Sequence, residues 1–321
     1  MVQRTLITGG AGFIGSHLCD HFLNMGHEVI CVDNLITGNE DNIRHLSGLR
    51  EFDFWREEVA DPELQTYFIT TNLDNVLHFA SPTGPRSYDK FSLQTLQAGS
   101  EGTNNMLELA YSKGARFLLA SSSEIYGDPW VHPQLESYNG SVSTINERAV
   151  YCETKRFAET LTMAYHRKFG TNVRIARMFN TYGPRMSLND GRVEPNFVIA
   201  ALKGEDLKVY GDGKQTRTFC YVSDMVDGIS KLLNSDYCEG EPVNLGSSKE
   251  MWIETFARLV INIVCSKSEI VKMPDYMPPG DASKRKPDLY KAEKLLGWSP
   301  KVGLREGLIK MVEDFRKRLG K

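Results

Sequence analysis

The sequence lacks three features that would place it in a special class of proteins: a surplus of one charge, a long apolar run and patterned cysteines. Its 38 lysine and arginine residues face 41 acidic residues, which leaves a formal net charge of −3. That balance excludes a general basic field of the kind that holds nucleic acid. The longest apolar stretch, residues 259–265, is interrupted by Asn262 and is far shorter than the roughly 20 residues that cross a bilayer. We therefore expect neither nucleic acid nor a membrane as a partner.

The six cysteines form no C-x-x-C pair and no Cys/His spacing typical of a metal site. Free thiols are the rule in a reducing compartment. The chain enters a strand-like segment at residue 4 and shows no apolar core of a signal peptide. These absences predict a cytoplasmic protein with no disulfide and no bound metal.

What the sequence does contain is a regular alternation of short apolar segments with amphipathic ones. Ile14, Leu18, Phe22 and Met25 recur at helical spacing, for example, and Gly26 ends that pattern. Such alternation predicts βαβ units around a doubly wound parallel sheet, a Rossmann fold of the α/β class, with ligands at the carboxyl ends of the strands. The predicted strands cover residues 4–8, 28–32, 75–79, 117–120 and 173–177.

A glycine-rich turn lies where the first predicted strand meets the first predicted helix. Gly9 permits the tight turn, Gly12 lets the backbone approach a pyrophosphate, and Gly15 lets helix and strand pack closely. The N-terminus of the following helix favours negative charge. Asp33 follows the second strand, where a carboxylate can accept both ribose hydroxyls and would repel a 2′-phosphate. The combination predicts NAD as the cofactor.

The composition changes after about residue 178, where glycine, proline and arginine become frequent. We expect residues 1–178 to form the NAD-binding Rossmann domain, with a return segment at about 219–245. Residues 179–321 are expected to form mainly a smaller α/β substrate domain. No linker separates the two parts, so we expect them to share a cleft.

Tyr151 and Lys155 form the pattern Y-x-x-x-K, which puts both side chains on one face of a helix. A phenol with a pKa of about 10 is a poor base at neutral pH. A nearby ammonium and the positive nicotinamide ring favour phenolate and lower that pKa. Tyr151 can then take a proton from a sugar hydroxyl as hydride leaves. Ser122, at the end of a predicted strand, is placed to hydrogen-bond the same hydroxyl.

These features together resemble the extended short-chain dehydrogenase/reductases, which are NAD-dependent nucleotide-sugar epimerases and dehydratases. Further segments are similar to one branch, the UDP-glucuronate decarboxylases or UDP-xylose synthases, from residue 5 to about 315. The resemblance implies a homodimeric lyase that decarboxylates UDP-glucuronate to UDP-xylose through a 4-keto intermediate. The dimer would pair through the helix at about 91–113 and the helix carrying Tyr151. The most selective segments are Ser122-Ser-Glu124, Asn189-Asp-Gly-Arg192 and Lys284-Arg-Lys-Pro-Asp288.

The resemblance also implies roles for single residues. Glu124 would line the sugar near C5 and C6, and Arg285 would face the substrate carboxylate. The implied catalytic residues are Tyr151, Lys155, Ser122, Ser123, Glu124 and Arg285. The implied cofactor contacts are Gly9, Gly12, Phe13, Ile14, Gly15, Asp33, Asn34, Thr37, Gly38, Glu58, Val59, Phe79, Ala80, Tyr151, Lys155 and Thr181. The implied UDP-sugar contacts are Pro85, Tyr88, Asn180, Arg185, Arg192, Tyr210, Gln215, Arg217 and Arg285.

Other functions use the same core. It would equally serve a UDP-hexose or UDP-uronate 4-epimerase, or a variant that releases a UDP-4-keto-pentose. A non-catalytic dinucleotide-binding protein would keep the glycine turn and would not need Tyr151. The chain also departs from its relatives, with Gly99 where they usually carry asparagine, Glu58 where they carry aspartate, and Arg86 as an extra charge in the substrate loop.

Overall fold

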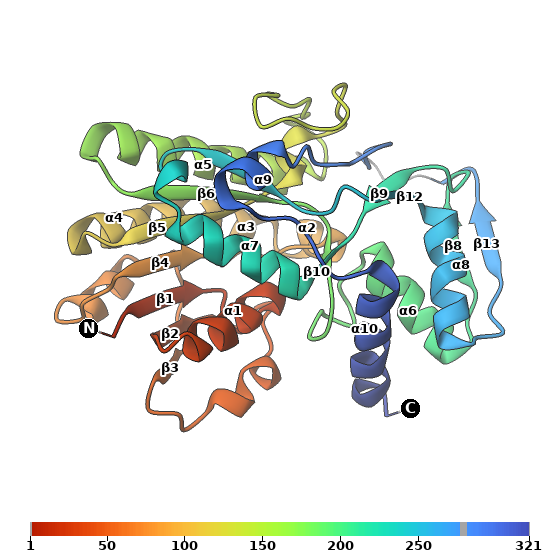
Figure 1. Cartoon of the computed structure of the whole chain (residues 1–321), viewed down its shortest axis with the longest axis horizontal. Coiled ribbons are helices and arrows are strands. Elements are labelled where there is room, and N and C mark those ends of the chain that lie inside the picture. The colour runs from red at the N-terminus through yellow and green to blue at the C-terminus, as the bar shows by residue number, and fades with distance from the viewer. Residues whose placement is uncertain (1, 277–280, 321) are drawn as a thin grey trace.

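The computed structural model describes residues 2–276 and 281–320, and its centre is a seven-stranded parallel sheet (Figure 1). The strand order is β11-β6-β5-β4-β1-β2-β3, with parallel pairing throughout. The winding reverses between β1 and β4, and an open sheet binds ligands at the carboxyl ends of such strands. The strands are β1 (Arg4–Thr8), β2 (Glu28–Val32), β3 (Phe52–Trp55), β4 (Asn75–His78), β5 (Arg116–Ser122), β6 (Val173–Met178) and β11 (Pro242–Leu245).

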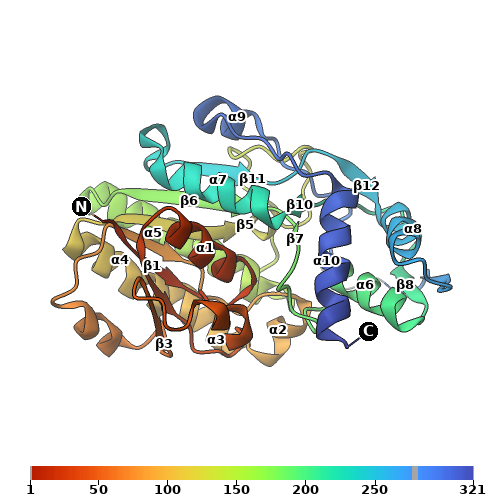
Figure 2. The ribbon, with the colours of Figure 1, turned by 60° about the horizontal axis from the view of Figure 1, so that its bottom comes forward.

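Alternate residues of each strand point into two apolar layers, because successive side chains of a strand face opposite sides of the sheet. Ile7 and Leu118 belong to one layer, and Leu6 and Leu119 belong to the other. Helices cover both layers, and α1 and α7 lie against each other on one face (Figures 1 and 2). The helices of that face are α1 (Phe13–Asn24) and α7 (Val222–Asn234), and those packed on the other layer are α4 (Thr103–Lys113) and α5 (Ala149–Phe169).

The predicted doubly wound α/β fold is confirmed, and the five predicted strands agree with the structure to within two residues at each end. The sequence did not predict β3. It is an edge strand in which Asp53 is exposed and Trp55 is half-buried. It therefore lacks the continuous apolar run that marks a strand buried on both faces.

Beyond β6 the chain builds a smaller lobe from helices and short two-stranded sheets (Figure 2). Between these elements it returns to the main sheet, where Pro242 of β11 pairs with Ile175 of β6. No helix in the described ranges is long and apolar enough to span a bilayer. The smaller lobe contains α6 (Val193–Lys203), α8 (Ile253–Val264), α10 (Leu304–Arg318), and the pairs β7 (Thr181–Tyr182) with β10 (Cys220–Tyr221), β8 (Leu207–Tyr210) with β13 (Ile270–Met273), and β9 (Thr216–Thr218) with β12 (Glu250–Trp252).

A π-helical turn, Ala98–Gly102, joins α3 to α4 and lies against α5. A Cβ atom at Gly99 would lie 1.8 Å from Cγ2 of Thr154 on α5. Glycine is therefore the residue that permits this close approach of backbone to side chain. The remaining elements are α2 (Pro85–Lys90), α3 (Ser92–Gln97), α9 (Tyr290–Leu296) and the 3₁₀ turns Glu40–Asn42, Arg44–Leu46, Pro62–Phe68, Ser123–Tyr126 and Asp236–Cys238.

Candidate functional site

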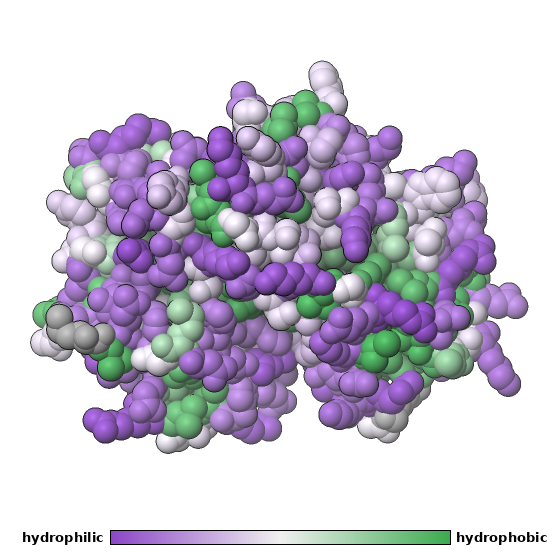
Figure 3. All heavy atoms as spheres, viewed as in Figure 1, coloured by the Kyte–Doolittle hydropathy of each residue, from purple (hydrophilic) through white to green (hydrophobic). Residues whose placement is uncertain are grey.

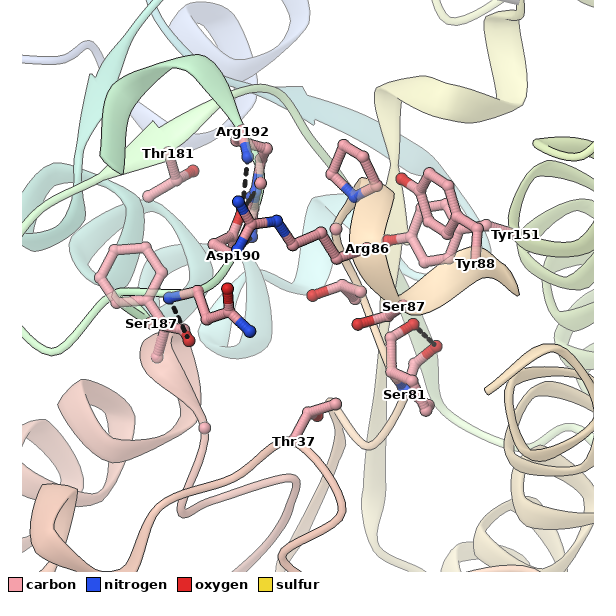
Figure 4. A pocket seen from close by; sticks show the side chains of 18 of the residues that line it. Thr37, Ser81, Arg86, Ser87, Tyr88, Tyr151, Thr181, Ser187, Asp190 and Arg192 are labelled. Atoms are coloured by element: carbon pink, nitrogen blue, oxygen red, sulfur yellow. Dashed lines mark hydrogen bonds and ion pairs between the residues drawn. The ribbon is translucent and has the colours of Figure 1, made fainter. Parts of the chain in front are cut away.

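A cavity of about 1240 Å³ lies between the carboxyl edge of the main sheet and the smaller lobe. Figure 3 shows the surface hollowed between the two lobes, and Figure 4 shows part of the cavity lining. Its volume exceeds the ~300–1,000 Å³ typical of a site for one small ligand, so it has room for a dinucleotide and a second nucleotide. Every cofactor, substrate and catalytic candidate predicted from the sequence lines this one cavity.

The glycine turn forms the cavity wall at the end of β1. Gly9 has a φ of +69°, and a Cβ there would lie 2.7 Å from the backbone N of Ala80. A Cβ at Gly15 would lie 2.1 Å from the carbonyl oxygen of Gly9. The N-cap of α1, Gly12, provides no side-chain hydrogen bond, so the first N–H groups of the helix are left for a ligand. Only bare backbone fits here, as a bound pyrophosphate requires.

Asp33 is held at the end of β2 by backbone amides. Its Oδ1 accepts a hydrogen bond from Leu35 N at 2.8 Å, and its Oδ2 accepts one from Ala11 N at 3.0 Å. Burial raises the pKa of this carboxyl, and the hydrogen bonds oppose that rise. Nearby, Asn34 Nδ2 donates to Glu58 Oε2 at 2.6 Å. The residues present therefore fit a dinucleotide whose adenosine ribose carries free hydroxyls.

Tyr151 and Lys155, in the first two turns of α5, lie close to Ser122 at the end of β5. Ser122 is close enough to Tyr151 to oppose the rise in the pKa of the phenol, and its Oγ accepts a hydrogen bond from Glu124 N at 3.2 Å. Lys155 Nζ lies 5.7 Å from the centre of the Tyr151 ring and donates to the carbonyl oxygen of Ala120 at 2.8 Å. Both Tyr151 and Lys155 are buried. The pair therefore lies beside the strand end at which ligands of such sheets react.

Burial dominates the pKa values in this corner. Burial raises the pKa of Tyr151 to about 12, although the hydrogen bond from Ser122 opposes the rise. Burial lowers the pKa of Lys155 to about 8. Burial therefore outweighs any neighbour in the protein alone, and the lowering of the Tyr151 pKa by Lys155 together with the nicotinamide ring stays a prediction.

A second tyrosine, Tyr88, and an arginine bound by Asp190 also line the cavity near Tyr151. The rings of Tyr88 and Tyr151 stack, with centroids 5.4 Å apart and planes inclined by 26° (Figure 4). Arg192 is held by Asp190 through Nε at 2.6 Å and Nη2 at 2.7 Å (Figure 4). The charge of Arg192 opposes the rise in the pKa of Tyr151. Tyr88 and Arg192, which were both predicted from the sequence, therefore lie in the same corner of the cavity as Tyr151.

Glu124 and Arg285 form a buried ion pair between the two lobes. Arg285 Nη1 donates to Glu124 Oε1, and Arg285 Nη2 donates to the carbonyl oxygen of Gly127 at 3.1 Å. Arg285 is only 3% exposed, and its Nε–H has no hydrogen-bond partner among the described residues. The arginines around Glu124 hold the pKa of this carboxyl below its usual value despite burial. The cavity wall therefore contains a fixed cation, whose own Nε atom is buried.

The other predicted substrate residues already have partners in the protein. Asn180 Nδ2 contacts Glu194 Oε1 at 3.4 Å, Gln215 Nε2 donates to Tyr210 O at 2.9 Å, and Arg217 pairs with Asp281 at 2.7 Å. Arg185 has a positive φ of 66° and an ion pair with Asp20 of α1 at 2.7 Å. A ligand that uses these groups must share or replace those contacts.

Among the charged residues of the cavity that sequence reasoning missed, Arg148 and Asp281 lie in the ion-pair cluster around Glu124. Arg148 Nη1 lies 3.7 Å from Glu124 Oε2, and Arg148 Nη2 lies 3.2 Å from Asp281 Oδ1. Neither residue belongs to a local motif, because Arg148 precedes α5 and Asp281 lies in a loop more than a hundred residues later. The only signal was that Arg148 comes one helical turn before Tyr151.

Comparison with known proteins agrees with this geometry. Residues 6–311 match the family model described as GDP-mannose 4,6 dehydratase. UDP-glucuronic acid decarboxylase 1 of Xenopus tropicalis is 49% identical over 99% of this chain and 73% of its own length. UDP-glucuronic acid decarboxylase 6 of Arabidopsis thaliana is 48% identical over 99% of this chain and 90% of its own length.

A solved structure shares the whole architecture. The UDP-glucuronic acid 4-epimerase of Bacillus cereus, in complex with UDP-glucuronic acid and NAD, superposes with a TM-score of 0.89 at 27% identity. The match covers 98% of this chain and 100% of that one. The chain thus shares its overall fold with a related protein that binds both ligands.

Proposed function

Because the chain belongs to the family of the GDP-mannose 4,6 dehydratases, the extended short-chain dehydrogenase/reductases, we propose that it is a UDP-glucuronate decarboxylase. In this proposal the enzyme binds NAD, forms a 4-keto intermediate and releases UDP-xylose. The main support beyond sequence identity is the position of Arg285. Its buried guanidinium, with an unpaired Nε–H, lines the same cavity as Ser122 and Tyr151. Guanidinium donors match carboxylate geometry, so this wall suits a sugar acid.

Each part of the cavity has a proposed ligand. The glycine turn, Asp33 and the Asn34–Glu58 pair would hold NAD. Asn180, Arg217 and the Tyr210–Gln215 segment would hold the UDP group. We keep the division into residues 1–178, with a return at about 219–245, and residues 179–321 as the proposed boundary between cofactor and substrate parts.

The proposed reaction begins and ends with proton transfer at Tyr151. When bound, NAD accepts a hydride from C4 of the sugar and later returns it. Tyr151 Oη removes the proton of the C4 hydroxyl, and Ser122, which lies beside Tyr151, orients that hydroxyl. Lys155 lies 5.7 Å from the ring and favours the phenolate form in this step.

The carboxylate leaves once C4 is a ketone, because C6 is then β to a carbonyl. The C5–C6 bond breaks, CO2 departs, and the electron pair remains as an enolate over C5, C4 and the C4 oxygen. A proton from solvent reaches C5, and Tyr151 returns its proton to the C4 oxygen as the hydride returns. Arg285 and Glu124 would fix the carboxylate group of the sugar so that the bond to C6 lies in position to break.

We also propose that the chain works as a homodimer in the cytoplasm. Leu93 of α3 is 68% exposed and Phe157 of α5 is 50% exposed, and these two helices contact each other. A second copy would cover these side chains in a four-helix bundle. All six cysteines are free thiols, which is compatible with a reducing compartment. Sedimentation at micromolar concentration should give a dimer, and a stable monomer would refute the assembly.

Mass spectrometry of a substrate panel tests the proposed reaction. UDP-glucuronate, UDP-galacturonate, UDP-glucose and UDP-galactose are each incubated with the enzyme and NAD. The proposal expects UDP-xylose from UDP-glucuronate alone. Formation of UDP-galacturonate would instead identify a 4-epimerase, and accumulation of NADH with a UDP-4-keto-pentose would identify a variant that releases the intermediate.

A further inference from the structure

We propose that Arg148 is a specificity-determining residue, which supplies the one positive charge that a sugar carboxylate neutralises and a neutral hexose does not. The inference rests on the proposed function, because it concerns recognition of the same sugar acid. It assigns a role to a side chain that no local motif revealed. Arg148 lines the cavity, and its side chain is largely buried.

The backbone of Arg148 is fixed relative to the reacting corner. Arg148 is the N-cap of α5, and its carbonyl oxygen accepts hydrogen bonds from Tyr151 N at 3.2 Å and Cys152 N at 3.1 Å. Its charge also acts on Tyr88, the ring stacked on Tyr151, where it opposes the rise in the pKa that burial causes. The guanidinium therefore lies within electrostatic reach of the place where the sugar reacts.

The charges around Arg148 do not balance. Three guanidinium groups, of Arg148, Arg217 and Arg285, share only two carboxylates, of Glu124 and Asp281, which leaves a formal charge of 3 − 2 = +1. Arg192 does not add to the surplus, because Asp190 chelates it through two hydrogen bonds. A buried charge without a partner is unfavourable, so this cluster favours a ligand that brings one negative charge.

The surplus falls on Arg148 because its own pairing is the weakest. Arg285 and Arg217 donate hydrogen bonds to Glu124 and Asp281 respectively. Arg148 approaches the same two carboxylates at 3.7 and 3.2 Å, and within the described part of the chain its guanidinium donates no hydrogen bond. A carboxylate between Arg148 and Arg285 would give both cations a direct partner.

A purely structural reading is that Arg148 only bridges Glu124 of one lobe to the Asp281 loop of the other. The two readings differ in what the loss of charge does. A missing bridge would weaken every UDP-sugar alike, whereas a missing specificity group would weaken the sugar acid alone.

Equilibrium binding separates these readings. Arg148→Gln and Arg148→Lys are made in a Tyr151→Phe background, which stops turnover, and dissociation constants for UDP-glucuronate, UDP-glucose and UDP are measured by calorimetry with NAD bound. Arg156→Gln is the matched control, because Arg156 lies on the same helix and bonds the carbonyl oxygens of Ile125 and Asn139 outside the cavity.

Arg148→Gln should weaken UDP-glucuronate at least tenfold, about 1.4 kcal/mol, and change UDP-glucose and UDP by less than about threefold. Arg148→Lys should restore most of the preference because it keeps the charge, and Arg156→Gln should leave the preference unchanged. Equal weakening of the acidic and neutral sugars would overturn the inference, as would an unchanged preference.

A second variant tests the charge surplus even if Arg148→Gln does not fold. Asp281→Asn raises the surplus by one, so the preference for UDP-glucuronate over UDP-glucose should increase severalfold. An unchanged or reduced preference would contradict the surplus. These binding ratios are measured without turnover, so they do not depend on the reaction that the enzyme catalyses. A wild-type enzyme that forms no UDP-xylose would overturn the proposed reaction. The binding data would still decide the role of Arg148.

Discussion

The cavity has a half proposed for the cofactor and a half proposed for the sugar acid, and the two are built in opposite ways. The cofactor half is formed by contiguous turns at the ends of β1 and β2. Its glycines allow close backbone approach, and a backbone amide binds Asp33. The sugar-acid half is assembled from charged side chains that lie far apart in the sequence, such as Glu124, Arg217 and Arg285. A local turn is specified by steric rules that any short segment reveals. A charge cluster becomes visible only when the fold brings its members together.

The largest expected effect comes from the corner where the halves meet. Tyr151→Phe removes the proton acceptor while keeping the ring that stacks on Tyr88. The turnover number should fall by about 10²–10⁴-fold, the usual range for a general base. The affinity for NAD should stay within a factor of about two to three of wild type, since the glycine turn is untouched. Rapid-quench kinetics with NAD titration would test both statements, and a variant that keeps near-normal turnover would remove Tyr151 from the mechanism.

The sugar-acid half should respond next, through Arg285. Arg285→Met leaves Glu124 buried with the longer ion pair to Arg148 and a contact from the Cys152 thiol, and breaking a buried ion pair costs about 3–5 kcal/mol. We expect a lower melting temperature and a loss of about 10- to 100-fold in kcat/KM for UDP-glucuronate, because charged hydrogen bonds contribute about 1.5–3 kcal/mol.

Lys284→Met is the matched control for Arg285→Met. Lys284 is the adjacent residue, is exposed and does not line the cavity. Its loss should change neither melting temperature nor kinetics. If the two variants behaved alike, the basic segment would be an ordinary solvated surface.

A steric clash alone should weaken cofactor binding in the cofactor half. A Cβ at position 15 would lie 2.1 Å from the carbonyl oxygen of Gly9, so Gly15→Ala must displace backbone. Overpacking of this kind costs about 1–3 kcal/mol, and we expect NAD affinity to fall by about tenfold or more. Gly303→Ala is a useful comparison, because Gly303 has an ordinary φ of −66° and no atom within 4 Å of its Cβ position. Unchanged NAD binding in Gly15→Ala would contradict the steric account.

The smallest effect is a pH dependence of stability that comes from Lys155. Its pKa is about 8 in the folded protein, below its ordinary value of 10.5. Between these two values the unfolded chain binds more protons than the folded one, so the contribution of Lys155 to stability rises with pH. Lys155→Met should flatten the increase in unfolding free energy from about pH 8 upward. Chemical denaturation at pH 7.5 and 9.5 would show it, and identical slopes for both proteins would contradict the low pKa.

The same contrast explains what the sequence could predict. The glycine turn, Asp33 and the Y-x-x-x-K pair were predicted because each is a local pattern with one physical reason, and all of them line the cavity. The edge strand β3 was not predicted, because its exposed Asp53 interrupts the apolar run. Arg148 and Asp281 were not predicted, because their pairing depends on how the smaller lobe packs against the larger one.

The high pKa of Tyr151 was not predicted for a related reason. Proximity of Lys155 was predicted correctly, but burial is a property of the whole cavity and outweighs one neighbour. Sequence patterns therefore locate chemical groups better than they predict the electrostatic balance among them.

The most direct measurement follows a single labelled substrate, UDP-glucuronate carrying deuterium at C4 and carbon-13 at C6. If the C4 hydride leaves the sugar and returns to it while the sugar stays bound, the products are labelled CO2 and UDP-xylose that retains deuterium at C4. Release of labelled CO2 with loss of the deuterium, or conversion to a uronate that keeps its carbon-13, would contradict the account.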